Sequence, residues 1–263
     1  MKLILIDVSS LAHRYWHAIK EPNAVIQGIL RNLRPLQETL DADQLVFCFD
    51  SESHKRRDFY PEYKGNRTRE GKEDLHRQIN LLRLEILPRM GFANLIHQQG
   101  YESDDLIARI CMTYTVKAGN EAIIVSTDTD MWQLLGRKVT IWNPAIKATY
   151  TVEQFRRDYK LEPRQWVAVK AVMGDKGDNI EGVDGVGEVL AVRYVRGESN
   201  PTFKSTQRIN DSGTLITRND KLIRLPWEGT MAVEIRKDSL SMDKWIAATV
   251  GYDVHAQHCP ITG

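Results

Sequence analysis

The sequence has few cysteines and no long apolar run, and these absences exclude several classes of protein. Its three cysteines, Cys48, Cys111 and Cys259, are far apart, and two of them lie inside apolar stretches. Such cysteines are typical of small buried side chains in a reducing compartment, not of a disulfide framework or a zinc site. No apolar run approaches the roughly 18 residues of a membrane span, and "MKLILID" is too short for a signal peptide. We therefore expect a cytoplasmic protein without membrane contact, in the host cytoplasm if it is viral.

An excess of charge of either sign is also missing. The 263 residues carry a formal net charge of +1, with 42% hydrophobic and 27% charged residues, which is ordinary for a globular chain. The length allows one large domain or two modest ones with a substantial core. Any affinity for nucleic acid must therefore come from local segregation of charge.

Strand-like and helix-like segments alternate over the first half of the chain. Four apolar runs are typical of buried strands: "LILID", "QLVFCFD", "ANLIH" and "EAIIVSTD". Helical patterns cover residues 24–40, 73–90 and 102–118. This alternation predicts an α/β fold with a mostly parallel sheet that helices cover on both faces. From about residue 161 helices follow without strands, which predicts a smaller helical region, and the tail beyond about 197 has no clear periodicity.

Aspartates stand at or just past the carboxyl ends of three of these strands. They are Asp7, Asp50 and Asp128. In open α/β sheets this edge is where ligands bind. A single aspartate there is more often a turn or helix cap, but three together fit one convergent site better.

The stretch "GYESDDLIARI" crowds three carboxylates, Glu102, Asp104 and Asp105, at the start of a predicted helix. The helix dipole favours acids there, and Ser103 as the cap would explain the stretch without any function. Unit charges about 4 Å apart, however, repel by roughly 1 kcal/mol in water and about 4 kcal/mol at a protein surface. A bound cation would relieve that repulsion.

Two further acidic pairs complete a candidate metal site, one in "STDTD" and one in "MGDKGD". Oxygen ligands without His or Cys select hard cations such as Mg²⁺ or Mn²⁺. The acids exceed the needs of one Mg²⁺, so the sequence predicts two ions, which suit in-line displacement at a phosphate. The predicted ligands are Asp7, Asp50, Glu102, Asp104, Asp105, Asp128, Asp130, Asp175 and Asp178.

Residues 53–72 form a basic strap that interleaves Lys and Arg with aromatic rings. A charge run is usually only a solvated face, but this one leaves the sheet directly after Asp50. We expect Lys64 and Arg67 to hold phosphates, and the rings, Tyr63 among them, to stack on unpaired bases. Cations beside a metal site can also neutralise an anionic transition state.

A glycine-rich turn, "GVDGVGEVLAVRYV", places Gly182, Gly185 and Gly187 before a helix. Glycines allow close backbone approach, and the free N–H groups of a helix start can receive a phosphate oxygen. No strand precedes the turn, so a dinucleotide fingerprint is excluded. A helix-turn-helix type element that grips duplex backbone fits better, and a plain helix–loop–helix corner is the alternative.

These residues resemble the structure-specific 5′ nucleases, which comprise flap endonucleases, bacteriophage 5′-exonucleases and the 5′-nuclease domain of bacterial DNA polymerase I. The matching motifs, in family order, are "LIDVSSLAHR", "FYPEYKGNR", "YESDDLIA", "VSTDTDMWQLL" and "KAVMGDKGDNIEGVDGVG". The resemblance implies a PIN-like nuclease domain over 1–165 with an arch at about 52–90. It also implies a helix-three-turn-helix region with a C-terminal tail over 166–263.

The resemblance also implies an activity and its cofactors. The expected enzyme is a monomer that cleaves DNA at 5′ ends, flaps or nicks, as a 5′-3′ exonuclease and flap endonuclease in replication or repair. Two Mg²⁺ ions serve it, Mn²⁺ can substitute, and the family often binds K⁺ at the glycine-rich turn.

The resemblance carries roles to matching residues of this sequence. Asp7, Asp50, Glu102, Asp104 and Asp105 correspond to the first metal cluster, and Asp128, Asp130, Asp175 and Asp178 to the second. Lys64 and Arg67 correspond to catalytic cations at the arch base, and Lys170 to a basic position near the duplex. The chain departs from the family at Val8, where Gly is common, and at Glu188 and Val189, where Lys or Arg is common. These departures predict that duplex binding through the glycine-rich turn is either weaker or shifted to Arg193 and Arg196.

Two other functions remain open at this level. One is a non-catalytic protein that binds branched DNA, against which the intact pair Asp175 and Asp178 speaks. The other is a PIN-type ribonuclease acting on single-stranded RNA, which would not need the glycine-rich turn or the basic strap.

Overall fold

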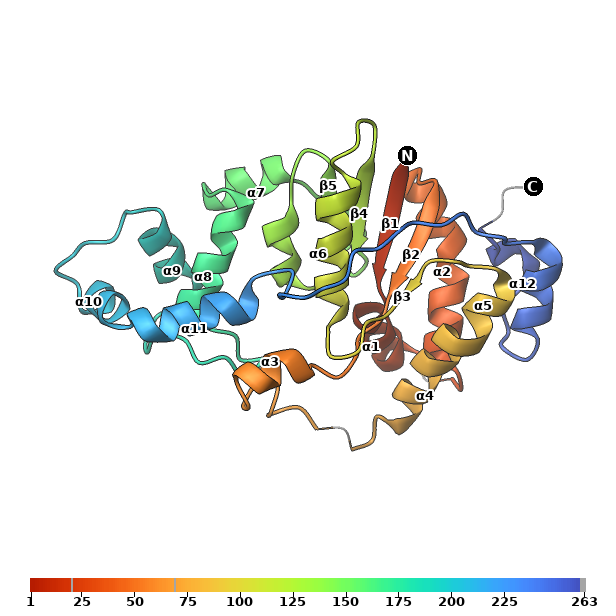
Figure 1. Cartoon of the computed structure of the whole chain (residues 1–263), viewed down its shortest axis with the longest axis horizontal. Helices are drawn as coiled ribbons and strands as arrows, with labels where there is room; N and C mark the ends of the chain where they lie inside the picture. Colours follow the sequence, from red (N-terminus) through yellow and green to blue (C-terminus); the bar gives the residue numbers. More distant parts are fainter. Residues whose placement is uncertain (20, 69, 261–263) are drawn as a thin grey trace.

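The computed structural model describes residues 1–19, 21–68 and 70–260, and a six-stranded sheet lies at its centre (Figure 1). The spatial order of the strands is β3-β2-β1-β4-β5-β6. They are β1 Lys2–Asp7, β2 Gln44–Cys48, β3 Leu95–Ile96, β4 Glu121–Val125, β5 Val139–Asn143 and β6 Ala148–Tyr150. Neighbouring strands are parallel, except that β6 runs antiparallel to β5. The predicted α/β fold with a mostly parallel sheet is confirmed.

The parallel register brings the carboxyl ends of β1, β2 and β4 to one edge of the sheet. Asp7 lies opposite Cys48, the last residue of β2, and Ile6 lies opposite Val125, the last residue of β4. The loops after these strands therefore leave the sheet beside one another. Asp50 and Asp128 stand in those loops, close behind the strand ends.

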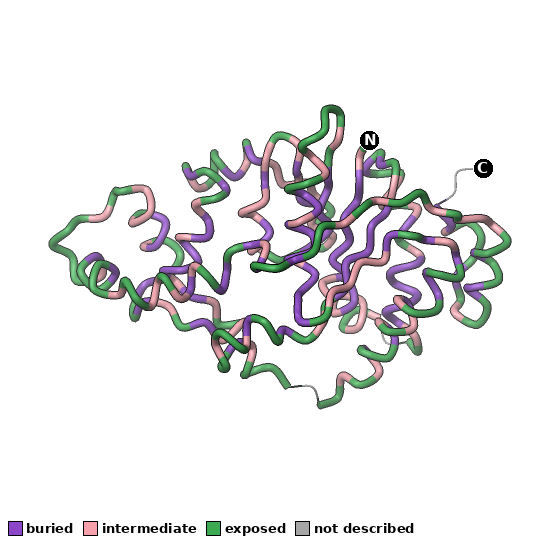
Figure 2. The backbone as a smooth tube through the Cα atoms, in the orientation of Figure 1, coloured by how far each residue is buried: buried purple, intermediate pink, exposed green. Residues whose placement is uncertain are grey.

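Both faces of the sheet are buried, as Figure 2 shows. Leu3 and Leu5 of β1 belong to one apolar cluster, while the alternate residues Ile4 and Ile6 belong to a second. This division follows from the side-chain period of two in a strand. Burying one such side chain stabilises the fold by roughly 1.5–3 kcal/mol. The two clusters fix the strands and, through them, the loops that carry the acids.

Helices pack on each face. α1 Val8–Ala18 and α2 Ala24–Leu40 contribute buried side chains to the cluster around Ile4. α6 Ser103–Tyr114 does so on the opposite face. The predicted helix 24–40 is confirmed, while α6 ends at Tyr114 and not at residue 118.

The predicted helix 73–90 is a continuous helical run with one wider turn. α4 Glu73–Leu81 continues into the π-helical segment η1 Leu82–Ile86, followed by α5 Leu87–Met90. Pro88 has no amide hydrogen for the carbonyl four residues before it, so a regular α-helical bond is missing where the run widens.

The remaining helices lie mainly at one end of the molecule (Figure 1). They are α7 Val152–Tyr159, α8 Trp166–Met173, α9 Glu188–Val195, α10 Lys204–Asp211 and α11 Gly213–Ile223. Short 3-10 turns are η2 Thr129–Leu134, η3 Pro163–Gln165 and η4 Ala256–His258. The sequence analysis missed α3 His54–Phe59 inside the basic strap, and it assigned neither β5, β6 nor the helices beyond residue 197. None of the helices in the described ranges is long and apolar enough to cross a membrane.

The C-terminal chain returns from the helical end to the opposite side of the sheet (Figure 1). There α12 Met242–Thr249 packs beside α5, and Trp245 is fully buried in the cluster that contains Ile4. The indole Nε1 donates a hydrogen bond to the carbonyl of His255 at 3.2 Å. The expected division at 165/166 therefore misplaces this tail, because its apolar side chains complete the core of the first region.

The docking of α12 can be tested with Trp245→Ala. Removing a fully buried indole costs about 3–5 kcal/mol, and we expect the melting temperature to fall by on the order of 10 °C. Ile246→Ala on the same helix is the control, because that side chain is 50% exposed. The control should change stability by less than about 0.5 kcal/mol. Equal effects of the two variants in a circular-dichroism melt would contradict the described packing.

Candidate active site

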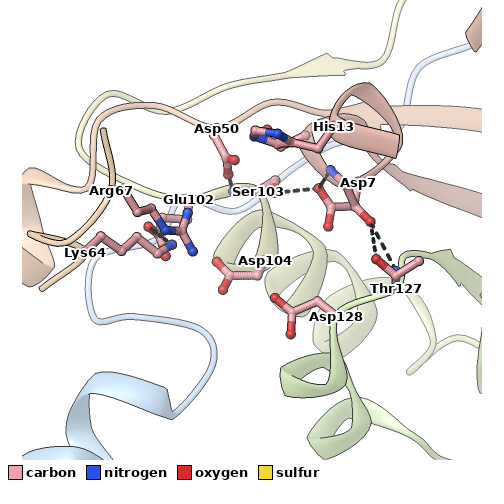
Figure 3. A pocket seen from close by; sticks show the side chains of 12 residues that line it. Asp7, His13, Asp50, Lys64, Arg67, Glu102, Ser103, Asp104, Thr127 and Asp128 are labelled. Carbon is pink, nitrogen blue, oxygen red and sulfur yellow. Dashed lines mark hydrogen bonds and ion pairs between the residues drawn. The ribbon is translucent and has the colours of Figure 1, made fainter. Parts of the chain in front are cut away.

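A cavity of about 280 Å³ opens at the carboxyl edge of the sheet (Figure 3). It gathers five of the nine predicted metal ligands: Asp7, Asp50, Glu102, Asp104 and Asp128. The other residues that line it are Ser9, Ser10, His13, Lys64, Arg67, Ser103 and Thr127. Strand ends, the start of α6 and the basic strap thus converge on one space. Asp105, Asp130, Asp175 and Asp178 lie outside its lining.

Asp7 is held by hydroxyl and amide groups and has no basic partner among the described residues. Its Oδ1 accepts from the Ser10 amide at 3.2 Å and the Ser103 hydroxyl at 3.1 Å, and its Oδ2 accepts from the Ser126 hydroxyl at 2.8 Å. Burial and the nearby Asp50 carboxylate raise the pKa of Asp7 to about 7. The hydrogen bonds fix the carboxylate but do not neutralise it.

The start of α6 joins Asp50 to the site. The Ser103 amide donates to Asp50 Oδ1 at 2.6 Å. Ser103 is not the helix cap that its sequence position suggested, because Glu102 occupies the N-cap and its amide donates to Asp105 Oδ2 at 3.2 Å. Ser103 instead uses its amide and its hydroxyl to tie two acids together.

The pKa values of Asp104 and Asp128 are raised, as that of Asp7 is. Burial, followed by the Asp105 carboxylate, raises the pKa of Asp104 well above its ordinary value. Burial and Asp178 raise the pKa of Asp128. Within the described ranges, no basic side chain forms an ion pair with Asp7, Asp50, Asp104 or Asp128. We call these four residues the first acid set.

The chemistry of the first acid set fits a hard divalent cation. All its donors are carboxylate oxygens, and a bound cation would relieve the repulsion that, after burial, raises the pKa values of Asp7, Asp104 and Asp128. Over the part of the chain that the structure describes, no three Asp, Glu, His or Cys side chains are close enough together to hold an ion unaided. A Mg²⁺ ion that keeps several of its waters needs only one or two direct carboxylate ligands.

Glu102 also reaches the cavity, but protein cations balance its charge. Its carboxylate is bonded to Lys64 Nζ and lies 3.4 Å from Arg56 Nη1. Burial alone would raise the pKa of Glu102, but Lys64 and Arg56 outweigh it and hold this pKa well below its ordinary value. Glu102 therefore anchors the strap to the sheet edge.

Asp105 is committed to a structural ion pair. Arg56 Nη1 and Nη2 donate to its two oxygens at 2.6 and 2.8 Å, and the Trp227 amide donates at 2.7 Å. Arg56 and Asp105 are both buried. We leave Asp105 out of the proposed ligands for this reason. The sequence analysis missed Arg56, because it lies in a basic run that was expected to face solvent.

The remaining acids, Asp130, Asp175 and Asp178, form a second acid set, in which each carboxylate already has a cation. Lys170 Nζ lies 2.7 Å from Asp130 Oδ1 and is also bonded to Asp175. Arg67 Nη2 donates to Asp178 Oδ1 at 2.6 Å. Lys170 and Arg67 thus pair with the three carboxylates of the second acid set, although burial, followed by Asp128, still raises the pKa of Asp130 to about 7.

The structure corrects the expected role of Lys170. Its side chain is buried between Asp130 and Asp175, and it is not a surface cation available to duplex DNA. Burial alone would lower the pKa of Lys170, but the two carboxylates outweigh it and raise this pKa, so the amine is charged.

Tyr63 cannot stack on bases, which is the second correction. Its side chain is only 2% exposed, and its hydroxyl lies 2.8 Å from Glu102 Oε2 and 2.9 Å from Asp178 Oδ2. One hydroxyl proton serves two carboxylates, so Tyr63 links the two acids. Tyr63 thereby ties the strap, of which it is part, to these two acids.

Lys64 and Arg67 line the cavity as the sequence predicted. They also line an adjoining cavity of about 520 Å³ between the basic strap and α4, together with Arg57, Lys72 and His76. Basic side chains therefore line the space under the strap together with the acids Asp50, Glu52 and Glu102, and Lys64 and Arg67 are shared by both cavities.

The glycine-rich turn joins α8 to α9. A side chain at Gly182 would put its Cβ 2.1 Å from the Met173 carbonyl oxygen, and Gly185 has a φ of +72°. Both positions thus require glycine. Gly187 precedes α9 as its N-cap, and Arg193 on α9 is exposed. These residues stand at the helical end, outside the lining of the acidic cavity.

Several small polar residues of the site were not singled out from the sequence. Ser10 and Thr127 share a hydrogen bond of 3.0 Å across the cavity wall, and Ser126 holds Asp7. His13 lines both cavities, and burial, followed by Lys72, lowers its pKa, which favours the neutral ring. The available signal was their position directly after β1 and β4, in the sequence beside Asp7 and Asp128.

Comparisons with known proteins agree with this architecture. A family model described as "5'-3' exonuclease, N-terminal resolvase-like domain" matches residues 2–160. The chain is 33% identical over 217 residues to a 5'-3' exonuclease of Mycoplasmopsis pulmonis (strain UAB CTIP), covering 80% of this chain and 70% of that protein. It is also 33% identical over 207 residues to a thermostable DNA polymerase I of Thermus thermophilus. That match covers 74% of this chain but only 24% of the polymerase, so the chain spans about a quarter of it.

A solved phage protein is similar over nearly the whole chain. The T5 5'-exonuclease with divalent zinc ions bound superposes with a TM-score of 0.74 at 26% identity, covering 98% of this chain and 97% of that one. The T5 flap endonuclease in a pseudo-enzyme–product complex with DNA and metal ions gives a TM-score of 0.71 at 26% identity, covering 98% and 96%. The family model, the relatives and the phage structures agree, and the chain belongs to the 5'-3' exonuclease family.

Proposed function

We propose that the protein is a divalent-metal-dependent 5′-3′ exonuclease and flap endonuclease that hydrolyses DNA near 5′ ends, flaps or nicks. The first acid set carries this proposal, because it places four carboxylates that have no ion-pair partner among the described residues beside Lys64 and Arg67 in one cavity, and Asp7 among them is buried. Such a site is poised for a metal-bound phosphate. The family and the metal-bound T5 structures support the same reading.

The carboxylates divide between two proposed Mg²⁺ ions, for which Mn²⁺ can substitute. Asp7, Asp50 and Asp104 would hold the first, with one or two of them as direct ligands and the others through its waters, and Glu102 lines the same cavity. The second acid set, together with Asp128, would hold the other. When bound, such ions lower the pKa of a coordinated water and stabilise charge on the phosphate.

The protein's own cations orient the substrate. Lys64 and Arg67 stand between the acidic cavity and the cavity under the strap, where they can hold the scissile phosphate and its neighbour. The strap cavity would take the 5′ strand. Gly182, Gly185 and Gly187 would contact the duplex backbone through amides, with Arg193 beside them, and K⁺ at this turn stays a prediction.

Cleavage assays distinguish this function from two alternative functions. A protein that only binds branched DNA would bind flaps without cleaving them in Mg²⁺. A PIN-type ribonuclease would cleave single-stranded RNA and leave flaps intact. The cation-lined cavity under the strap favours the DNA nuclease, because it offers a path for a strand toward the acids.

Asp128→Asn tests the metal ligands. The amide keeps the shape of the side chain but removes the charge, so Mg²⁺-dependent cleavage of a 5′-labelled flap should fall at least about 10³-fold. Asp41→Asn is the matched control, because its side chain is fully exposed and it precedes β2, at the opposite end of that strand from Asp50. Unchanged cutting by Asp128→Asn, with Mg²⁺ required in both proteins, would reject this residue as a ligand.

Tyr63→Phe distinguishes a role of the Tyr63 hydroxyl in holding Glu102 and Asp178 from a role of its ring in stacking on bases. The ring survives in this variant, but both carboxylates lose the hydroxyl, so we expect cleavage to slow about tenfold or more. Lys64→Met should slow it by roughly 10²-fold with the fold intact. Full activity of Tyr63→Phe in single-turnover rates would favour the stacking role that the structure contradicts.

The raised pKa of Asp7 predicts a pH dependence of stability in chelator. From its ordinary value of 3.8 up to about 7, the folded state holds the Asp7 proton more tightly than the unfolded state. The free energy of unfolding therefore falls as pH rises through this window and levels off above it. Asp7→Asn cannot ionise, so its melting temperature relative to wild type should rise by a few degrees between pH 4 and pH 8. Parallel melting curves for the two proteins would contradict the raised pKa.

A further inference from the structure

The two acid sets differ in charge balance although they lie next to each other. The first acid set has no basic partner among the described residues, whereas every member of the second acid set does. Asp128 and Asp130 mark the boundary, since the Asp130 amide donates to Asp128 Oδ1 at 2.8 Å. A cation entering the first acid set meets free carboxylates, and one entering the second meets carboxylates that are already paired.

Lys170 is the centre of the second acid set. It comes from the last turn of α8, and its side chain is 5% exposed. Its Nζ contacts Asp130 Oδ1 at 2.7 Å and Asp175 Oδ2 on the other side. A buried helix fixes the start of the side chain, so the ammonium is held between two oxygens that a metal would also need.

We infer that Lys170 is a resident counter-ion that competes with a divalent metal for Asp130 and Asp175, and so makes the second metal site weaker than the first. This inference rests on the proposed two-metal function. The ammonium pairs with Asp130 and Asp175 before metal arrives, and a metal ion can bind these oxygens only when Lys170 releases them.

Lys170 is therefore a positioning residue for the metal and not a direct contact of duplex DNA. Its removal should have two effects of opposite sign. Without metal, Asp130 and Asp175 lose their counter-charge, and the protein becomes less stable. With metal, the competitor is gone, and the weaker site should bind more tightly.

The test measures Mn²⁺ binding to the DNA-free full chain by electron paramagnetic resonance and titration calorimetry. In wild type we expect one tighter and one weaker ion. In Lys170→Met the weaker ion should bind at least tenfold more tightly, and the tighter ion should be unchanged. Lys176→Met is the matched control, because it removes an exposed positive charge next to Asp175 in the same loop. The control should change either affinity less than twofold.

Thermal melting gives a second readout, independent of activity. Lys170→Met should melt lower than wild type in chelator, and Mn²⁺ should raise its melting temperature more than it raises that of wild type. If the methionine variant does not fold, Lys170→Gln keeps a hydrogen-bond donor to the carboxylates and undergoes the same two measurements.

The outcomes separate the inference from the proposed function. Unchanged or weaker Mn²⁺ binding in the Lys170 variants, or two ions of equal affinity in wild type, would overturn the competition and leave the nuclease proposal standing. A wild-type protein that binds no Mn²⁺ at all would overturn the proposed function itself.

Discussion

Repulsion between carboxylates that are gathered at one edge of the sheet is the constraint on which the rest of the site depends. The parallel register of β1, β2 and β4 forces Asp7, Asp50 and Asp128 toward one edge, and α6 adds Asp104. No basic side chain forms an ion pair with these four among the described residues, and burial, followed by the Asp50 carboxylate, raises the pKa of Asp7 to about 7. The sheet core supplies the stability that holds them together. Such a cluster is suited to binding a cation.

The protein treats its other acids differently, and the contrast explains the layout around the cavity. Arg56 neutralises Asp105 beneath the strap, while Lys64 and Tyr63 tie Glu102 to it. These acids anchor the strap, and its cations Arg57, Lys64, Arg67 and Lys72 line the adjoining cavities. The near-zero net charge of the chain does not reveal this local segregation of charge around the cavities.

The acids at the strand ends can be predicted from the sequence, because the carboxyl ends of parallel strands lie at one edge of the sheet. The sequence does not reveal which acids are balanced, since the partners are distant in the chain: Arg56 and Asp105 are 49 positions apart. Tyr63 was expected to stack on bases because aromatic rings among cations suggest it, and only the packing shows its hydroxyl buried between two carboxylates. The return of Trp245 to the sheet core also escaped prediction, because the tail lacks a clear period before it docks.

The most direct test of the account is the anomalous scattering of a crystal of the full chain soaked in Mn²⁺. The account predicts a manganese peak in the cavity within coordination distance of carboxylates of the first acid set, Asp7, Asp50, Asp104 and Asp128. A crystal with no manganese in this cavity, or with manganese only at unrelated surface carboxylates, would contradict it.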